Sequence, residues 1–152
     1  MGNSESNANP IRNMDKRTAR REYREAFIAA ISRYRSVNVS HSNDEDMSKH
    51  PWSGGDIRVC VRKRPIHKRE LDAFEFDVVS SSGNKVIVHD ARMHIDMKRQ
   101  FINHHEFEFD KVFGDSADNE KVYQESVRSL VDIAIDGGFG TALVYGQVSK
   151  SY

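Results

Sequence analysis

Residues 141–147 read Thr-Ala-Leu-Val-Tyr-Gly-Gln, and this apolar run ending in a glycine decides the fold class. Such a run predicts a buried strand that enters a phosphate-binding loop. The P-loop pattern requires a glycine, four more residues and then Gly-Lys-Ser/Thr, so that backbone N–H groups and a lysine hold the phosphates and a hydroxyl binds Mg²⁺. Counted from Gly146, that triplet would begin at Ser151, and Lys150 comes too early. The sequence therefore predicts an NTPase motif that is begun here and not completed.

A helix is predicted directly before this strand. Asn119 is suited to its N-cap, and Gly137-Gly138 to its C-terminal end. Between them, apolar residues recur at helical spacing: Val122, Tyr123, Val127, Leu130, Val131 and Ala134. A helix followed by an apolar strand and a glycine loop is typical of an α/β nucleotide-binding sheet.

Further strands are predicted upstream. Ile57, Val59 and Val61 alternate with polar residues, the period of a half-buried strand, which Pro65 ends. Two more β segments follow at 74–79 and 85–88, separated by a turn at 81–84. Another strand is predicted at 107–109, and the chain leaves it at Val112 and Phe113. Residues 89–103 show no clean period and are interpreted as a long excursion.

Composition limits the class of protein. The chain has 152 residues, enough for one domain with a core, but its 30% charged residues make it polar for that size. Cys60 is the single cysteine, which excludes a disulfide framework and indicates an intracellular protein. No apolar run reaches membrane-spanning length, so no membrane partner is expected.

The zero net charge hides a basic amino-terminal region. Residues 1–13 are expected to be disordered, 14–35 to form a basic amphipathic helix, and 36–56 to be a linker. The helix has a stripe of apolar and aromatic residues: Tyr23, Phe27, Ala30, Ile31 and Tyr34. Three interpretations remain open: a solvated face packed by this stripe, a helix that binds an acidic protein surface, and a nucleic-acid-binding arm. The last lacks a recognisable base-reading motif.

Four stretches resemble, in the right order, the amino-terminal part of the kinesin motor domain. These are Ile57–Pro65, with its Arg-x-Arg-Pro motif; Phe107–Phe113, similar to Phe-x-Phe-Asp-x-x-Phe; the helix from Asn119; and Tyr145-Gly146-Gln147, similar to the start of the P-loop. The resemblance covers 57–147 and leaves 148–152 as a tail outside the family pattern. It implies an incomplete kinesin-type P-loop NTPase sheet of the α/β class.

Val88-His89-Asp90 and His94-Ile95-Asp96-Met97 look most like kinesin-13, the internal-motor class that depolymerises microtubules. The resemblance implies a finger tipped by Lys-Val-Asp that contacts tubulin, and here the tip would be His94, Ile95 and Asp96. Histidine in place of lysine weakens the positive charge at neutral pH. A basic neck helix precedes the motor in that class, and the counterparts here would be Lys16, Arg17, Arg20, Arg21 and Arg24.

The resemblance also implies an ATP site with Mg²⁺ in the complete motor. Its partial counterparts here are Arg62, Arg64 and Pro65, which would flank the adenine, together with Gly146 and Gln147. The family's switch motifs, which follow the P-loop, do not occur in the sequence, so no catalytic residue is assigned and the 152-residue chain is expected to hydrolyse no ATP.

The leading hypothesis is therefore a fragment of a kinesin-like microtubule motor, at microtubules of the cytoplasmic cytoskeleton including the spindle. The alternative is a short, non-catalytic protein that binds tubulin through the basic helix and the finger. A metal site is not expected, because the adjacent His104 and His105 would point to opposite faces of a strand. The 141–145 strand is expected to lack a neighbour and to form an aggregation-prone edge.

Overall fold

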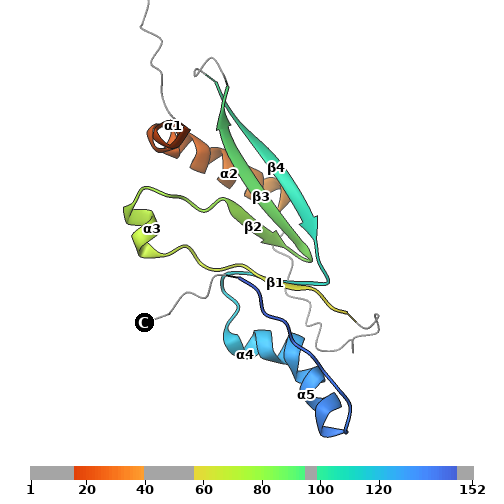
Figure 1. Ribbon diagram of the computed structural model, residues 1–152. Coiled ribbons are helices and arrows are strands. Elements are labelled where there is room, and N and C mark those ends of the chain that lie inside the picture. The colour runs from red at the N-terminus through yellow and green to blue at the C-terminus, as the bar shows by residue number, and fades with distance from the viewer. Residues whose placement is uncertain (1–15, 40–56, 95–98, 147–152) are drawn as a thin grey trace, which may run out of the picture. The chain divides into compact units, whose positions relative to one another are not determined.

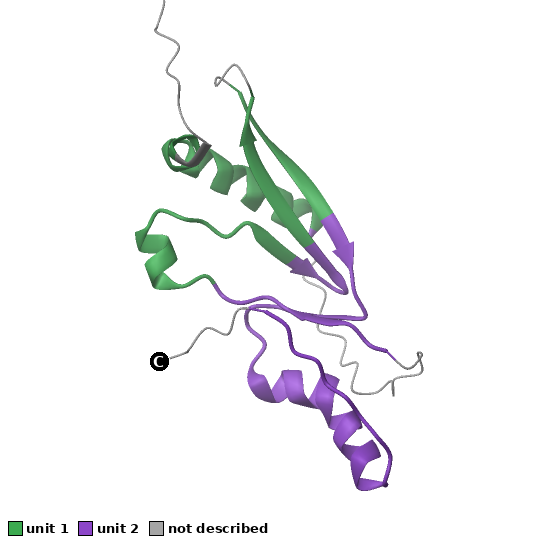
Figure 2. Ribbon diagram, in the orientation of Figure 1, with its two compact units in different colours: residues 1–38, 66–80, 87–105 green, residues 39–65, 81–86, 106–152 purple. Residues whose placement is uncertain are grey.

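The computed structural model describes residues 16–39, 57–94 and 99–146 of the 152-residue chain. It is a mixed α/β structure, which confirms the predicted class (Figure 1). The chain divides into two compact units: unit 1 contains residues 1–38, 66–80 and 87–105, and unit 2 contains the rest (Figure 2). Among the described helices, none has the length and apolar character needed to cross a bilayer.

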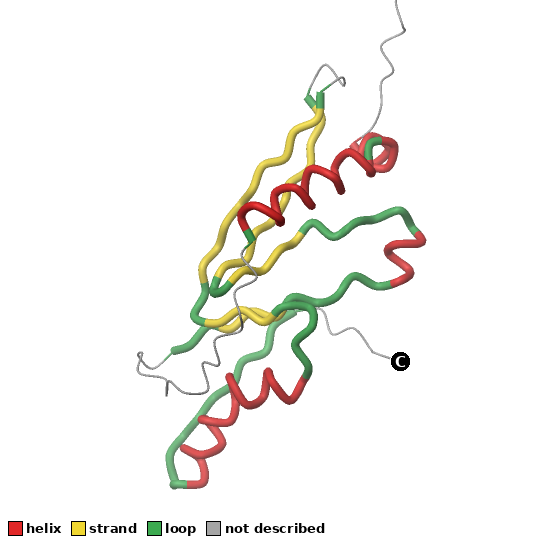
Figure 3. Tube along the Cα trace, turned by 180° about the vertical axis from the view of Figure 1, so that it is seen from behind, coloured by secondary structure: helices red, strands yellow, loops and turns green. Residues whose placement is uncertain are grey.

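Unit 1 is built on an antiparallel sheet of three strands in the order β2-β3-β4. The strands are β2 (Val79–Ser82), β3 (Lys85–Met93) and β4 (Gln100–Glu108). The turn between β2 and β3, at 81–86, and the last residues of β4, 106–108, are grouped with unit 2. Three helices belong to the unit: α1 (Lys16–Glu22), α2 (Arg24–Asn38) and α3 (Lys68–Asp72). The α2 helix runs along the sheet in both views of the chain (Figures 1 and 3).

The core of unit 1 forms between α2 and the sheet. Phe27 and Ile31, each 1% exposed, pack with Phe76 and Ala91. The rings of Phe27 and Phe76 stack with centroids 6.1 Å apart. Burial of apolar surface therefore holds α2 on the sheet. The helical stripe predicted from the sequence supplies these contacts, although Ala30, one of its members, is exposed.

The β3–β4 hairpin corrects the prediction for 89–103. The sequence pattern predicts an excursion without period here, whereas in the structure 89–93 complete β3 and 100–103 begin β4. Along β3, burial alternates, with His89 and Ala91 buried and Arg92 exposed. The period is carried by a histidine and an alanine, which a hydropathy pattern does not count as apolar positions. The expected finger is thus a continuation of the sheet.

The segment predicted as a strand at 74–79 is mostly not one. Only Val79 belongs to β2. Phe74 has φ of +62° and is 64% exposed, and its N–H donates to the Leu71 carbonyl at the end of α3. A left-handed residue cannot continue an extended strand, so the chain straightens only after it. The strand at 85–88 is confirmed, and the turn at Gly83-Asn84 has the positive φ that glycine supplies, +56°.

Unit 2 has a parallel pair of short strands, β1 (Cys60–Arg62) and β5 (Lys111–Phe113), with Val61 opposite Val112. The predicted strand at 57–61 is therefore shorter and later, and Ile57 is 80% exposed. The predicted exit at Val112 and Phe113 is itself β5, and both side chains are buried. The strand predicted at 107–109 corresponds to the last residues of β4, which ends at Glu108.

The predicted helix before the P-loop is confirmed. It consists of α4 (Asn119–Val122), a π-helical turn (Tyr123–Val127) and α5 (Arg128–Ile135). Its N-cap is Asp118 and not the predicted Asn119: Asp118 Oδ1 accepts a hydrogen bond from the Lys121 N–H at 2.8 Å.

Glycines end this helix as predicted. Gly137 has φ of +84°, and the Gly138 N–H donates to the Ile133 carbonyl at 2.9 Å, so that the chain reverses. The returning chain follows α5 closely at Gly140 (Figure 3). It can do so because glycine has no Cβ, and a Cβ there would lie only 3.1 Å from Leu130 Cβ.

The apolar run at 141–145 is not a strand in the structure, contrary to the prediction of a buried one. Leu143, Val144 and Tyr145 are more than 90% exposed. A parallel strand needs neighbours for its backbone groups, and the described residues pair none with this run. The predicted strand is therefore not formed in the structure, and the predicted aggregation-prone edge stays a prediction.

Candidate functional site

Arg62, the first candidate for the nucleotide site, is the last residue of β1 and is used to hold the chain before α4. Its Nη1 donates to Asn119 Oδ1 and its Nη2 to the Ala117 carbonyl, both at 2.7 Å. The planar guanidinium thus joins the end of β1 to the start of the helix. This position makes Arg62 a residue that shapes the loop, in addition to any contact with a base.

Arg64 and Pro65 come after Lys63 and are both exposed. Between them and β1, the Lys63 N–H donates to the Phe113 carbonyl at 2.8 Å, and Lys63 Nζ lies 3.3 Å from Asp115 Oδ2. Lys63 therefore fixes the backbone from which Arg64 and Pro65 project. A guanidinium plane and a rigid apolar ring are suited in general to the two faces of a purine, and the role of Arg64 and Pro65 at an adenine stays a prediction.

Gly146, the predicted first glycine of the phosphate loop, is in the same unit and is exposed. Its φ is +145°, a value that favours glycine over residues with a side chain. Gln147 lies outside the described residues. Of the predicted ATP-binding residues, the structure thus brings Arg62, Arg64 and Pro65 together at the end of β1 and places Gly146 at the end of an unpaired segment.

A buried ionic contact below β1 and β5 was missed by the sequence analysis. Lys111 Nζ lies 2.6 Å from Glu125 Oε2, and each side chain is only 11% exposed. Glu125 Oε2 accepts no hydrogen bond within the described part of the chain, so the attraction is that of an ion pair. Arg58 Nη1 donates to the Glu125 carbonyl at 2.6 Å. Both contacts are made by Glu125 in the π-helical turn. They could not be predicted from the sequence, because no local sequence motif indicates such a turn.

Cys60 lies in β1 beside this contact. Burial raises the pKa of its thiol, with a smaller opposing effect from the Arg58 guanidinium. A protonated thiol is a poor nucleophile, so the environment gives Cys60 a structural role in the strand.

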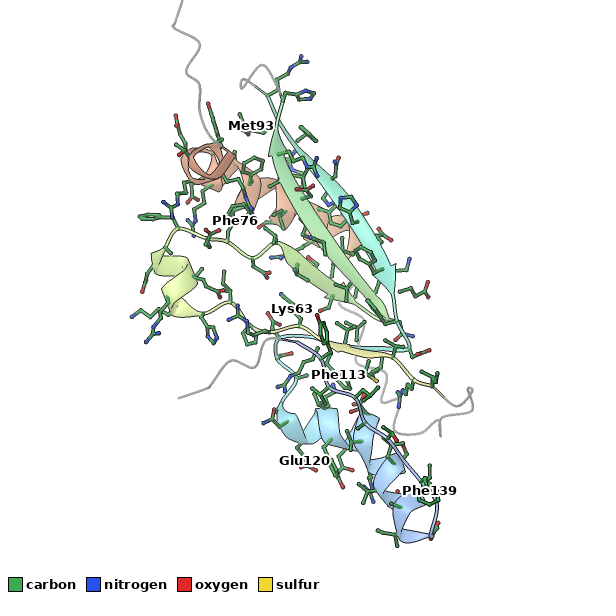
Figure 4. All side chains as sticks on the ribbon, viewed as in Figure 1. Lys63, Phe76, Met93, Phe113, Glu120 and Phe139 are labelled. Atoms are coloured by element: carbon green, nitrogen blue, oxygen red, sulfur yellow. The ribbon has the colours of Figure 1, made fainter. Side chains whose placement is uncertain are left out.

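The candidate tubulin-binding finger is the β3–β4 hairpin of unit 1. His94, the first residue of the predicted tip, is exposed; its N–H donates to the Arg99 carbonyl at 2.8 Å, and its ring centroid lies 4.9 Å from that of Phe101. Met93 packs against the core of unit 1 at the end of the hairpin (Figure 4). Ile95 and Asp96 lie outside the described residues. The base of the tip is therefore firmly attached to the sheet.

The predicted basic residues differ in their surroundings. Lys16 and Arg17 lie in α1, and their side chains are not described. Arg20 is partly buried, with its guanidinium carbon 5.4 Å from the centroid of the Phe76 ring, and Arg24 pairs with Glu25 at 2.8 Å. Arg21 is exposed. The helix α1 and the far end of the hairpin lie at the same end of unit 1 in both views (Figures 1 and 3).

Comparisons with known proteins agree with this arrangement of motifs. A family model described as kinesin motor domain matches residues 62–152. The Kinesin-like protein KIF24 of Mus musculus is 37% identical over 130 residues, which cover 82% of this chain and 9% of that protein. KIF24 of Homo sapiens is 33% identical over 132 residues, or 82% of this chain and 10% of that protein. The chain thus spans about a tenth of the length of these relatives.

Solved structures of microtubule-bound motors are also similar. A KIF14 dimer in a two-heads-bound state, with AMP-PNP and in complex with a microtubule, is 28% identical; the match covers 54% of this chain and 22% of that one, with a TM-score of 0.40. KIF14 with ADP in complex with a microtubule is 29% identical over 56% of this chain and 23% of that one, with a TM-score of 0.39. TM-scores this low do not by themselves support a fold.

Proposed function

The chain belongs to the kinesin motor domain family, and on this premise we propose that it is the amino-terminal part of a kinesin-13-like motor whose complete form couples ATP hydrolysis to the removal of tubulin from microtubules. Its place is at microtubules of the cytoplasmic cytoskeleton, including the spindle. The observation that carries the proposal is the position of α1, with its arginines, at the same end of unit 1 as the end of β3 and the start of β4.

This end of unit 1 is suited to an acidic protein surface. Arg21 is exposed on α1, and His94 is exposed at the base of the tip. The partly buried Arg20 contributes charge close to the same surface while its side chain packs on Phe76, whereas the charge of Arg24 is paired with that of Glu25. Exposed charges of one sign attract an acidic partner and make the association sensitive to salt. Lys16, Arg17, Ile95 and Asp96 extend the proposed tubulin-binding surface beyond the described side chains.

The nucleotide-binding half of the proposal rests on unit 2. Arg64 and Pro65 would hold the adenine of ATP, and Gly146 with Gln147 would begin the loop around its phosphates. Arg62 would keep the chain before α4 in place through Asn119 and the Ala117 carbonyl. In the complete motor, ATP with Mg²⁺ supplies the phosphoryl group that is transferred to water.

Microtubule co-sedimentation of the 152-residue chain tests the tubulin-binding surface. We expect pelleting at low salt that is lost as the salt concentration rises. Arg21→Glu should weaken binding several-fold, whereas Arg33→Glu, an identical charge reversal at an exposed site in the second half of α2, should leave it nearly unchanged. No pelleting at low salt, or equal losses for the two variants, would refute this surface.

The alternative is a short, non-catalytic protein that binds tubulin through the same helix and finger. Both proposals predict pelleting of the 152-residue chain, so the transcript decides between them. A message that continues past the codon for Gln147 into the rest of a P-loop and the switch motifs supports the motor. A message that ends at Tyr152 supports the non-catalytic protein.

A further inference from the structure

A chain of polar side chains with a buried centre links α2 to the sheet of unit 1, outside the surfaces proposed for ATP and tubulin. Ser80 is 4% exposed and His89 is 1% exposed. Arg35 Nε donates to Ser80 Oγ at 2.7 Å, and Ser80 Oγ lies 2.7 Å from His89 Nε2. On the other side of the ring, His89 Nδ1 lies 2.7 Å from His104 Nδ1. The network joins α2 to all three strands.

The contact between the two histidines can hold only one hydrogen. A hydrogen bond between two imidazole nitrogens needs one N–H and one lone pair. If both rings became imidazolium, two N–H groups would face each other across 2.7 Å, and the bond would be replaced by repulsion. The folded pair therefore binds at most one proton beyond its neutral state, whereas two independent histidines in an unfolded chain bind two.

The charged and titratable groups around the pair disfavour a second proton. From α2, the Arg35 cation also donates to the Asp77 carboxylate at 3.1 Å and to the Val79 carbonyl at 3.0 Å, so its charge remains close to Ser80. The Tyr34 ring, also from α2, stacks on His104 at 3.8 Å between centroids. His104 is the member of the pair that reaches solvent.

The remaining titratable neighbours lie on the other face of the sheet. Asp90 follows His89 on β3 and pairs with Arg92, and His105 Nε2 lies 4.0 Å from the same Asp90 carboxylate. Adjacent residues of a strand point to opposite faces, so this carboxylate lies on the face opposite to His89. On the α2 side, the Asp77 carboxylate forms an ion pair with Arg35 at 3.1 Å.

We propose that Arg35, Ser80, His89 and His104 form a pH-sensitive latch that holds the second half of α2 on the sheet at neutral pH and releases it as the pH falls through the range in which free histidine is protonated. The hydrophobic contacts of Phe27 and Ile31 secure the first half of the helix, and the latch secures the part that contains Tyr34 and Arg35. The latch itself does not depend on the proposed function. Because α1 directly precedes α2, an effect of releasing α2 on microtubule binding through the basic α1 would rest on that function.

The sign and size of the effect follow from proton binding. The unfolded chain binds at least one proton more than the folded pair at acidic pH, so stability falls as the pH falls. Each excess proton reduces the folding equilibrium constant about tenfold per pH unit below the titration range. Between pH 7.5 and 5.5 we expect a reduction of about tenfold for one excess proton and about a hundredfold for two.

Urea denaturation of the 152-residue chain at a series of pH values tests the latch without tubulin. The folding equilibrium constant of the wild-type chain should fall at least about tenfold between pH 7.5 and 5.5. In His104→Gln the amide accepts from a doubly protonated His89 without repulsion, so about tenfold of the reduction should disappear. His105→Gln, which removes the neighbouring histidine on the other face, should keep the full reduction. Parallel pH profiles for the wild type and His104→Gln would overturn the proposal.

A measurement on the wild-type chain covers the case in which His104→Gln does not fold. Nitrogen-15 spectra of the histidine rings report whether each ring is neutral or doubly protonated. We expect that His89 and His104 are never both imidazolium while the chain remains folded. Two imidazolium signatures in the folded chain would overturn the latch, and neither experiment depends on whether the chain binds microtubules.

Discussion

Replacing Ile31 by valine tests whether α2 is part of the folded sheet. Ile31 is 1% exposed and lies in the core with Phe27, Phe76 and Ala91. The change deletes one buried methylene and keeps the β-branched shape, which typically costs about 1 kcal/mol in a core of this kind. With a denaturant slope of about 2 kcal/mol per M urea for a chain of this size, the midpoint of unfolding should fall by about 0.5 M.

The assay is urea denaturation followed by circular dichroism, together with amide hydrogen exchange of β3. The matched control is Val37→Ala, which trims a side chain that is 77% exposed on the same helix. Alanine favours helix more than valine does, so the control midpoint should stay constant or rise slightly. If Ile31→Val leaves both the midpoint and the β3 exchange unchanged, α2 is an independent arm and the assigned core is wrong.

Three further predictions concern unit 2. Lys111→Met should destabilise the chain by about 3 kcal/mol in thermal melts, because it leaves the Glu125 carboxylate buried without its cation, and adding Glu125→Gln should recover most of the loss. Asp118→Ala should cost about 1 kcal/mol by removing the cap on the Lys121 N–H, while Asp118→Asn should cost less; equal melting temperatures for the two variants would contradict the cap. The raised pKa of Cys60 means that the folded chain keeps its thiol proton when the unfolded chain loses it. The resulting stability is fully present below the pKa of the unfolded thiol and is lost as the pH rises from there through the raised pKa of the folded thiol. Alkylation of Cys60 at pH 8 should therefore be slower in the folded chain than in urea, and equal rates would refute the effect of burial.

The parts of the fold that were predictable have strong local signals. The helix from Asn119 combines helical spacing with a glycine end, and only its cap was misplaced, by one residue. The strand at 85–88 has adjacent apolar residues and a glycine turn before it. The predicted family rested on the order of several motifs along the chain, which constrains far more than any one of them.

The remainder depended on contacts that no local pattern contains. His89 and Ala91 face α2 in β3, so the alternation in this strand becomes visible only when the helix is in place. Phe74 was counted as a strand residue, yet its backbone completes the end of α3. The function of Arg62 in holding the chain before α4 needed the position of Asn119, 57 residues away in the sequence.

The π-helical turn at Tyr123–Val127 has a consequence for how this helix is compared between relatives. A π-helical turn holds one more residue than an α-helical turn, and each residue of an α-helix turns the chain by about 100°. A relative with one residue fewer at this point can keep both flanking helical segments in place and simply lose the wider turn. A one-residue gap between Tyr123 and Val127 is therefore a conservative place to align such sequences, whereas the same gap within α5 would rotate Leu130 and every later side chain away from its present face.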